Sequence, residues 1–177
     1  MYLTTLEPDL HIHCVEPSQS TFNQLKFNVE SNHLQNVVSL YQMAVWKDHG
    51  QQNLFPGPSS GRRSLFPQSH QEVSGPSEIV NCTTLGELCE VCGETEVALV
   101  KIDTEGAELE IVEAASAETL RKIKRFAIEI HEDFRPGTRD RITKHLASHG
   151  FTLTNITTPP NRGNALGIMR AKRSETR

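Results

Sequence analysis

The sequence lacks a long apolar run, and the hydrophobic residues that make up 36% of its 177 residues are spread along the chain. A helix that crosses a membrane needs about 20 consecutive apolar residues, so we expect no membrane span. The N-terminus also lacks the charged and apolar regions of a signal peptide. These absences predict a soluble, cytoplasmic protein, and the length suits a single domain, residues 1–177, with one hydrophobic core.

An excess of positive charge is also lacking, because the formal net charge is −4 and the pI is about 6.1. Binding to a phosphate backbone needs a concentrated basic face, so we expect no nucleic-acid partner. The one basic cluster runs from Arg170 to Arg177. We interpret residues 171–177 as a solvated basic tail.

Cysteine is scarce, and its spacing does not favour a metal site. Only Cys89 and Cys92 have the CxxC spacing, and no second CxxC or HxxxH pair follows them. The residues around them read as a short helix that ends at Gly93. We therefore expect reduced, partly buried thiols rather than a zinc centre.

What the chain does contain is an alternation of strand-like and helix-like segments. The expected strands are His11 to Val15, Val37 to Tyr41, Met43 to Trp46, Ile79 to Thr83, Val97 to Asp103 and Arg125 to His131. The expected helices are one capped by Ser18 or Ser20, then Leu85 to Cys92, Ala107 to Ala115, Thr119 to Lys124 and Pro136 to His149. Two final strands, Phe151 to Thr157 and Ala165 to Arg170, read as a hairpin. This order predicts an α/β fold with a doubly wound, mostly parallel sheet and an antiparallel C-terminal hairpin.

The composition shifts to Gly, Pro, Ser and Gln between Lys47 and Ser77. The apolar pairs Leu54-Phe55 and Leu65-Phe66 are its only anchors. Such a segment is too poor in apolar residues for a second core, so we interpret residues 47–77 as an insertion or hairpin arm.

An apolar run ends in a group of carboxylates at Asp103, Glu105 and Glu108, around Gly106. The carboxyl ends of parallel strands are where open α/β sheets bind ligands, so these acids lie where chemistry is expected. Acids also favour the first turn of a helix, which is the alternative reading. That alternative explains Glu105 and Glu108 better than it explains Asp103.

Several motifs together resemble the FkbM family of S-adenosylmethionine-dependent methyltransferases. They occur in order from about His11 to His131: CVEPS, Asn28 with Asn32, Ala44-Val45, Asp48 with Gly50, SSGRRSL, Thr84-Leu85, LVKIDTEGAELEIVEAA and AIEIH. The KIDxEGxE block is the most specific of them. The resemblance implies a Rossmann-like class I methyltransferase sheet and S-adenosyl-L-methionine as the cofactor.

The resemblance also implies cofactor-binding residues. Glu16 would accept hydrogen bonds from the two ribose hydroxyls, and Met43 and Ala44 would pack against the adenine ring. Asp103 would lie near the methionine end of the cofactor or the acceptor hydroxyl. From the residues alone, Glu16 is as readily an acid before a turn, and Met43 is as readily a core residue.

Methyl transfer needs an acceptor oxygen that loses its proton as it attacks, so a base must lie beside it. The candidate catalytic residues are Asp103 and Glu105 at one strand end, and Glu129 and His131 at the next. His131 is the first candidate because imidazole titrates near neutrality, although a lone strand-end histidine is more often a solvated or capping residue. A metal held by Asp103, Glu129 and His131 is a weaker alternative, and we predict none.

The front of the chain departs from the family pattern, because no strand runs into a glycine-rich turn. Residues Met1 to Leu6 resemble the end of the helix that should follow that turn, so we expect an N-terminally truncated sheet that lacks its first strand. Two hypotheses follow. The chain is an O-methyltransferase for a hydroxyl on a small molecule, sugar or lipid, or it is a truncated, non-catalytic remnant or interaction module.

Overall fold

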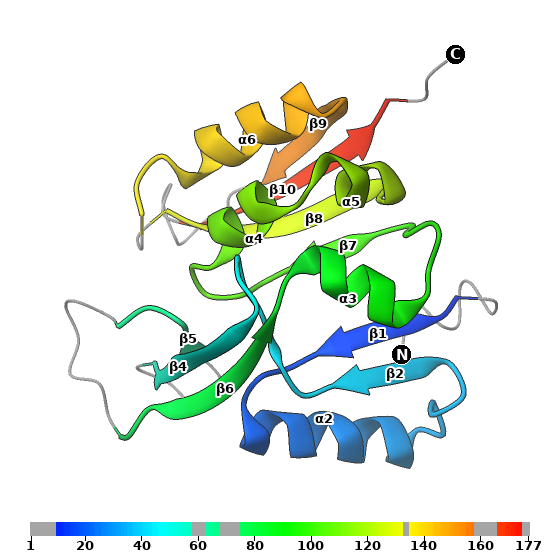
Figure 1. Ribbon diagram of the computed structural model, residues 1–177, viewed down its shortest axis with the longest axis vertical. Helices are drawn as coiled ribbons and strands as arrows, with labels where there is room; N and C mark the ends of the chain where they lie inside the picture. Colours follow the sequence, from blue (N-terminus) through cyan, green and yellow to red (C-terminus); the bar gives the residue numbers. More distant parts are fainter. Residues whose placement is uncertain (1–9, 58–62, 68–74, 133–134, 158–165, 175–177) are drawn as a thin grey trace.

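The computed structural model describes residues 10–57, 63–67, 75–132, 135–157 and 166–174 (Figure 1). The helices are α2 (Gln19–Ser31), α3 (Leu85–Cys92), α4 (Glu108–Ala114), α5 (Ala117–Lys122) and α6 (Thr138–Ser148). The strands are β1 (Ile12–Val15), β2 (Val38–Tyr41), β3 (Ala44–Val45), β4 (Gly50–Pro56), β5 (Arg63–Ser64), β6 (Glu78–Thr83), β7 (Val100–Ile102), β8 (Arg125–His131), β9 (Phe151–Thr157) and β10 (Leu166–Arg173). The expected helix end at residues 1–6 lies outside the described residues.

The described strands form three sheets, in the orders β1-β2, β7-β8-β10-β9 and β3-β6-β4-β5. Three pairs are parallel, namely β1 with β2, β3 with β6 and β7 with β8. The antiparallel C-terminal pair of β9 and β10 is confirmed. The expectation of a mostly parallel sheet is wrong in detail, because β4 runs antiparallel to both β5 and β6, and β10 runs antiparallel to β8.

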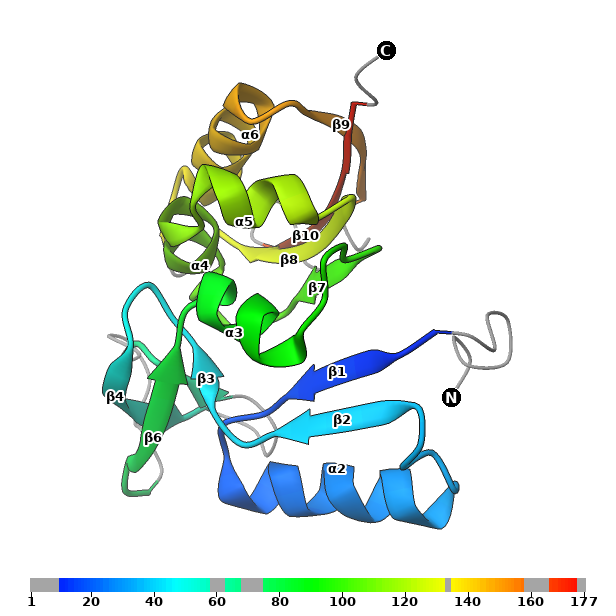
Figure 2. The same cartoon turned by 45° about the vertical axis from the view of Figure 1, so that its right-hand side comes forward.

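The sheet is interrupted between β1 and β7. Among the described residues β1 pairs with β2 alone, and β7 pairs with β8 alone. Figures 1 and 2 both place the β1–β2 pair on one side of β7 and β8 on the other. The strand expected over Val97 to Asp103 is shorter, with only an isolated bridge from Val97 to Ile123 before it. Leu99, which precedes β7, is 46% exposed.

The main core lies between β7, β8 and β10 and the helices α4, α5 and α6 (Figure 2). In β8, Phe126, Ile128 and Ile130 alternate along one face and are fully buried in this core. The same period of two places Glu129 and His131 together on the other face. The burial pattern of β8 therefore presents both predicted site residues on one side of the sheet.

Local signals fix several element ends. In α3, Thr84 Oγ1 accepts a hydrogen bond from the backbone N–H of Glu87, and the Glu87 carboxylate accepts one from the N–H of Thr84. Gly93 closes the helix with a φ of 71°, which favours glycine. At α2, Ser18 occupies the N-cap position, one of the two expected, but its side chain makes no cap bond.

The segment expected to be an arm contains β4 and β5, which pair antiparallel with each other. Leu54 is buried, and the ring of Phe66 packs edge-on against Trp46 with 5.4 Å between the ring centroids. These contacts attach the segment to the core near α4. No described helix is long and apolar enough to cross a membrane.

The C-terminal strand is longer than expected. β10 continues through Arg173, so the first three residues of the expected basic tail belong to the sheet. Residues 175–177 lie outside the described part of the chain. The four cysteines are free thiols, as expected, and Cys82 and Cys89 are buried.

Candidate active site

His131 ends β8 and is the centre of the candidate site. Its side chain is 6% exposed, and its Nδ1 lies 3.1 Å from Oε1 of Glu108, which is fully buried at the start of α4. A carboxylate only accepts hydrogen bonds, so this contact assigns the proton to Nδ1 of the imidazole. In the neutral ring Nε2 is then the basic nitrogen.

The charges around His131 act on its pKa in opposite directions. Burial disfavours the charged imidazolium and is the largest single influence, but the carboxylates of Glu108, Glu105 and Glu129 together outweigh it. The net result is a pKa for His131 above the ordinary value of 6.5.

Residues 103–107, which we call the acidic loop, wrap around the Glu108 carboxylate. Glu108 Oε1 accepts hydrogen bonds from the hydroxyl of Thr104 at 3.1 Å and from the N–H of Gly106 at 2.9 Å. Between them Glu105 has a φ of 51°, in the left-handed region. This conformation brings Oε2 of Glu105 to 3.4 Å from Nε2 of His131.

Asp103 and Glu129 complete the group. Asp103 is exposed and accepts a hydrogen bond from Lys101 Nζ at 2.8 Å, whereas Glu129 is half-buried on β8. One ligand atom from each of Asp103, Glu129 and His131 lies within 4.8 Å of the others. A divalent cation fits such a spacing, but acids gather in this way in many proteins without an ion, and we assign no metal here. The structure therefore brings all four predicted catalytic residues together.

The residues expected to bind the cofactor lie after β1 and β2. Glu16 is half-buried, and its Oε1 accepts a hydrogen bond from the N–H of Ser18 at 2.8 Å. Burial raises the pKa of Glu16, and this outweighs the lowering influences of the Ser18 hydrogen bond and of Arg63. Met43 is half-buried, whereas Ala44 is buried in the core and pairs with Cys82 of β6.

Two consecutive residues of β5 connect the segment that follows β1 with the acidic loop that follows β7. Arg63 Nη2 lies 3.4 Å from the hydroxyl of Ser20, which follows Glu16 closely in the chain. The next residue, Ser64, donates from its hydroxyl to the backbone oxygen of Glu105 at 2.7 Å. Figure 2 shows β1 and β2 pointing toward the end of the molecule that holds β4 and β6. The carboxyl ends of β1 and β7 therefore face the same side.

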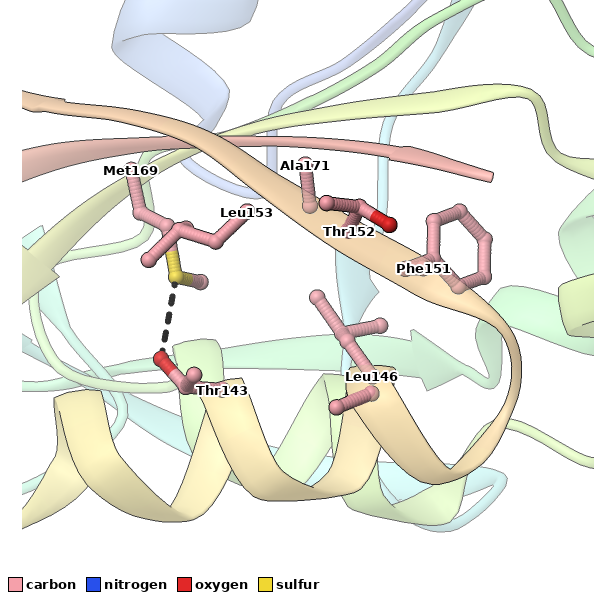
Figure 3. A pocket seen from close by; sticks show the side chains of 8 residues that line it. Thr143, Leu146, Phe151, Thr152, Leu153, Met169 and Ala171 are labelled. Atoms are coloured by element: carbon pink, nitrogen blue, oxygen red, sulfur yellow. Dashed lines mark hydrogen bonds between the residues drawn. The ribbon is translucent and has the colours of Figure 1, made fainter. Parts of the chain in front are cut away.

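A cavity of about 250 Å³ lies elsewhere, between α6 and the β9–β10 hairpin (Figure 3). Its lining is mostly apolar and comprises Thr143, Leu146, Ala147, Phe151, Thr152, Leu153, Met169 and Ala171. None of the predicted site residues contributes to it. The cavity is therefore separate from the candidate active site.

Sequence reasoning missed two functional contacts. The sequence places Glu108 among the acids at a strand end or in the first turn of a helix, but it does not show that the side chain turns inward to His131. Ser64 belongs to the SSGRRSL motif of the resemblance, but that motif assigns the serine no contact. The available signals were this motif and the position of Glu108 at the end of the specific KIDxEGxE block.

Comparisons with known proteins identify the fold and the family. Similar solved structures include a human methyltransferase 10 domain containing protein, with a TM-score of 0.53, 15% identity and coverage of 96% of this chain and 63% of that one. The METTL16 methyltransferase domain gives a TM-score of 0.52, 15% identity and coverage of 96% and 52%. Sp1610 of Streptococcus pneumoniae, described as a candidate tRNA methyltransferase, gives 0.50, 13% identity and coverage of 94% and 55%.

These identities support the fold alone, and the chain spans about half to two thirds of the length of the proteins it resembles. No curated protein matches it. The model of the methyltransferase FkbM domain, however, matches residues 4–153, which is most of the chain. The protein therefore belongs to the FkbM family of methyltransferases.

Proposed function

We propose that this protein transfers the methyl group of S-adenosylmethionine to a hydroxyl oxygen of a small-molecule, sugar or lipid acceptor. The observation that carries the proposal is the buried His131, held through Nδ1 by Glu108 and directed through Nε2 toward Glu105. It lies where the carboxyl ends of β7 and β8 meet, which is the ligand-binding edge of an open α/β sheet.

In this proposal His131 is the general base. When bound, the cofactor supplies a methyl group on a sulfonium, which is transferred to the attacking oxygen. As that oxygen attacks, its proton moves to Nε2 of His131, and the Glu108 carboxylate stabilises the imidazolium that forms. Asp103, Glu105 and Glu129 lie around the same position and orient the acceptor.

Glu16 is the residue that we propose for the cofactor ribose. It follows β1 directly, and its hydrogen bond from Ser18 fixes one carboxylate oxygen. A carboxylate held just past a strand end fits two adjacent hydroxyl donors. Met43 and Ala44, which follow β2, would lie against the adenine, and Asp103 would face the reacting end of the cofactor.

The interruption between β1 and β7 bears on cofactor binding. An unpaired strand edge exposes a row of backbone donors and acceptors, which a further strand would satisfy. We propose that a strand between β1 and β7 completes the sheet and the cofactor site in the active enzyme. Without such a strand, the second hypothesis applies, and the chain is a scaffold that holds no cofactor.

Calorimetric titration with S-adenosylhomocysteine tests both the ribose role of Glu16 and the need for a strand between β1 and β7. We expect weak or no binding to the 177-residue chain and clear binding to a version extended by an added N-terminal segment that supplies this strand. Micromolar affinity for the shorter chain would show that the strand is not needed.

In the extended protein, Glu16→Ala should raise the Kd by about 10- to 100-fold, because a charged acceptor of two hydroxyls is lost. Glu30→Ala on exposed α2 is the matched control and should leave the Kd unchanged.

The role of His131 has a separate test. His131→Ala should lower kcat by about 100-fold or more, the usual contribution of a general base, while the Kd of the cofactor stays the same. Equal losses in turnover and in cofactor affinity would contradict its assignment to the acceptor side.

A further inference from the structure

Ser64 makes two hydrogen bonds at the boundary between the arm and the acidic loop. It is 1% exposed, although it lies in a two-residue strand within a polar segment. Its hydroxyl donates to the backbone oxygen of Glu105 at 2.7 Å and accepts from the N–H of Phe66 at 3.1 Å. A buried hydroxyl with both roles used is fixed in its orientation.

The peptide unit between Glu105 and Gly106 is held at both of its polar groups. Its carbonyl oxygen accepts from Ser64, and its N–H donates to the carboxylate of Glu108 at 2.9 Å. A rotation of this peptide would break both hydrogen bonds. Ser64 and Glu108 therefore hold it from opposite ends.

This restraint matters because Glu105 is in an unfavourable backbone conformation. Its φ of 51° is left-handed, a conformation that residues with a side chain rarely adopt. Such a conformation persists only where the surroundings impose it. The conformation also directs the Glu105 carboxylate to 3.4 Å from Nε2 of His131.

We propose that Ser64 is a positioning residue of the active site, which holds the Glu105 carboxylate beside Nε2 of His131 through the peptide between Glu105 and Gly106. Its effect on turnover rests on the proposed function, whereas its effect on His131 does not. The inference also links the arm to the active site, because Arg63, the neighbour of Ser64, contacts Ser20 on the cofactor side.

Four carboxylates surround His131, and only one of them depends on Ser64. Glu108 comes from α4, Glu129 from β8 and Asp103 from the end of β7. Asp103 lies at the start of the acidic loop, next to β7, whereas Glu105 belongs to the peptide unit that Ser64 contacts directly. Removal of the Ser64 hydroxyl should therefore alter the contribution of Glu105 and leave the other three in place.

The test is an NMR titration of the His131 ring in Ser64→Ala, with Ser77→Ala as the matched control. Ser77 is an exposed serine at the end of the same arm, and its hydroxyl contacts Asn53. We expect a lower His131 pKa in Ser64→Ala, because the negative charge of Glu105 is no longer held nearby. Ser77→Ala and Ser64→Thr, which keeps the hydroxyl, should match the wild type. Ser64→Cys, whose thiol is a weak donor, replaces the alanine variant if that variant does not fold.

A double-mutant cycle identifies the route of the effect. Glu105→Gln should lower the His131 pKa in the same direction, and adding Ser64→Ala to it should produce little further change. In turnover assays Ser64→Ala should reduce kcat by about tenfold, with the KM and the cofactor Kd unchanged.

Two results would overturn the proposal. One is an unchanged His131 titration in a folded Ser64→Ala protein, even if that protein melts at a lower temperature. The other is full additivity of the two substitutions. Because the titration needs no methyl transfer, an inactive wild type would count against the proposed function and leave the positioning role decided by the NMR result.

Discussion

Glu108 and His131 are 23 residues apart in the sequence, yet Oε1 of one lies 3.1 Å from Nδ1 of the other, and both side chains are buried. The contact joins the first turn of α4 to the last residue of β8. It also fixes which nitrogen of the imidazole is basic, so a structural bond and a chemical property depend on the same carboxylate.

Removing that carboxylate should destabilise the fold. Glu108→Ala leaves the N–H of Gly106, the hydroxyl of Thr104 and Nδ1 of His131 without their buried acceptor. We expect the free energy of unfolding to fall by about 3 kcal/mol in urea denaturation. Glu113→Ala in the same helix removes only a surface pair with Arg141, so its loss should stay below about 1 kcal/mol. Equal losses in the two variants would show that Glu108 is not an internal anchor.

The raised pKa of His131 predicts the pH dependence of turnover. The neutral ring is the base, and it becomes populated only as the pH passes the folded-state pKa, which lies above 6.5. We therefore expect kcat to increase with pH, with its acidic limb above 6.5. Glu105→Gln removes a negative charge near Nε2 and should move that limb to lower pH. A limb that stays in place or moves to higher pH would exclude Glu105 as a partner of the base.

The same shift predicts how stability depends on pH. A histidine whose pKa is raised by folding stabilises the folded state fully below the unfolded pKa of about 6.5, and the stabilisation is lost as the pH rises through the higher folded value. The difference in unfolding free energy between the wild type and His131→Gln should therefore shrink as the pH is raised through this range. Chemical denaturation at a series of pH values measures it, and a difference that grows with pH would contradict the direction of the shift.

The capping box of α3 allows a test of the fold alone. Thr84→Ala removes the acceptor for the N–H of Glu87 and should lower the unfolding free energy by about 1 kcal/mol. Thr84→Ser keeps the hydroxyl and should retain most of the stability. Thermal or urea denaturation distinguishes the two, and indistinguishable midpoints would mean that the cap contributes nothing.

The parts of the fold that depend on neighbouring residues were predictable from the sequence. The bounds of α3 match the prediction because Thr84 and Gly93 mark its two ends locally. The bounds of β8 match because its apolar residues alternate against a core that covers one face. β7 is shorter than its apolar run, because strand length also depends on a pairing partner.

The residues of the candidate site also divide into those that local sequence predicts and those that depend on distant contacts. Asp103, Glu105, Glu129 and His131 were predicted together because the carboxyl ends of neighbouring parallel strands meet at one edge. The contacts of Glu108 and Ser64 were not predicted, since they arise from an inward-turned side chain and from the docking of a distant arm. Both residues lie in motifs of the family resemblance, but no local pattern shows which residues their side chains contact.

The edge-on packing of Trp46 against Phe66 has a practical consequence. The chain contains a single tryptophan, and it is 7% exposed beside the residue that follows Ser64 by two positions. Its fluorescence therefore comes from the contact between β3, which Trp46 follows, and Phe66 of the arm. Tryptophan fluorescence therefore reports, without an added label, whether the segment around Phe66 is packed against Trp46.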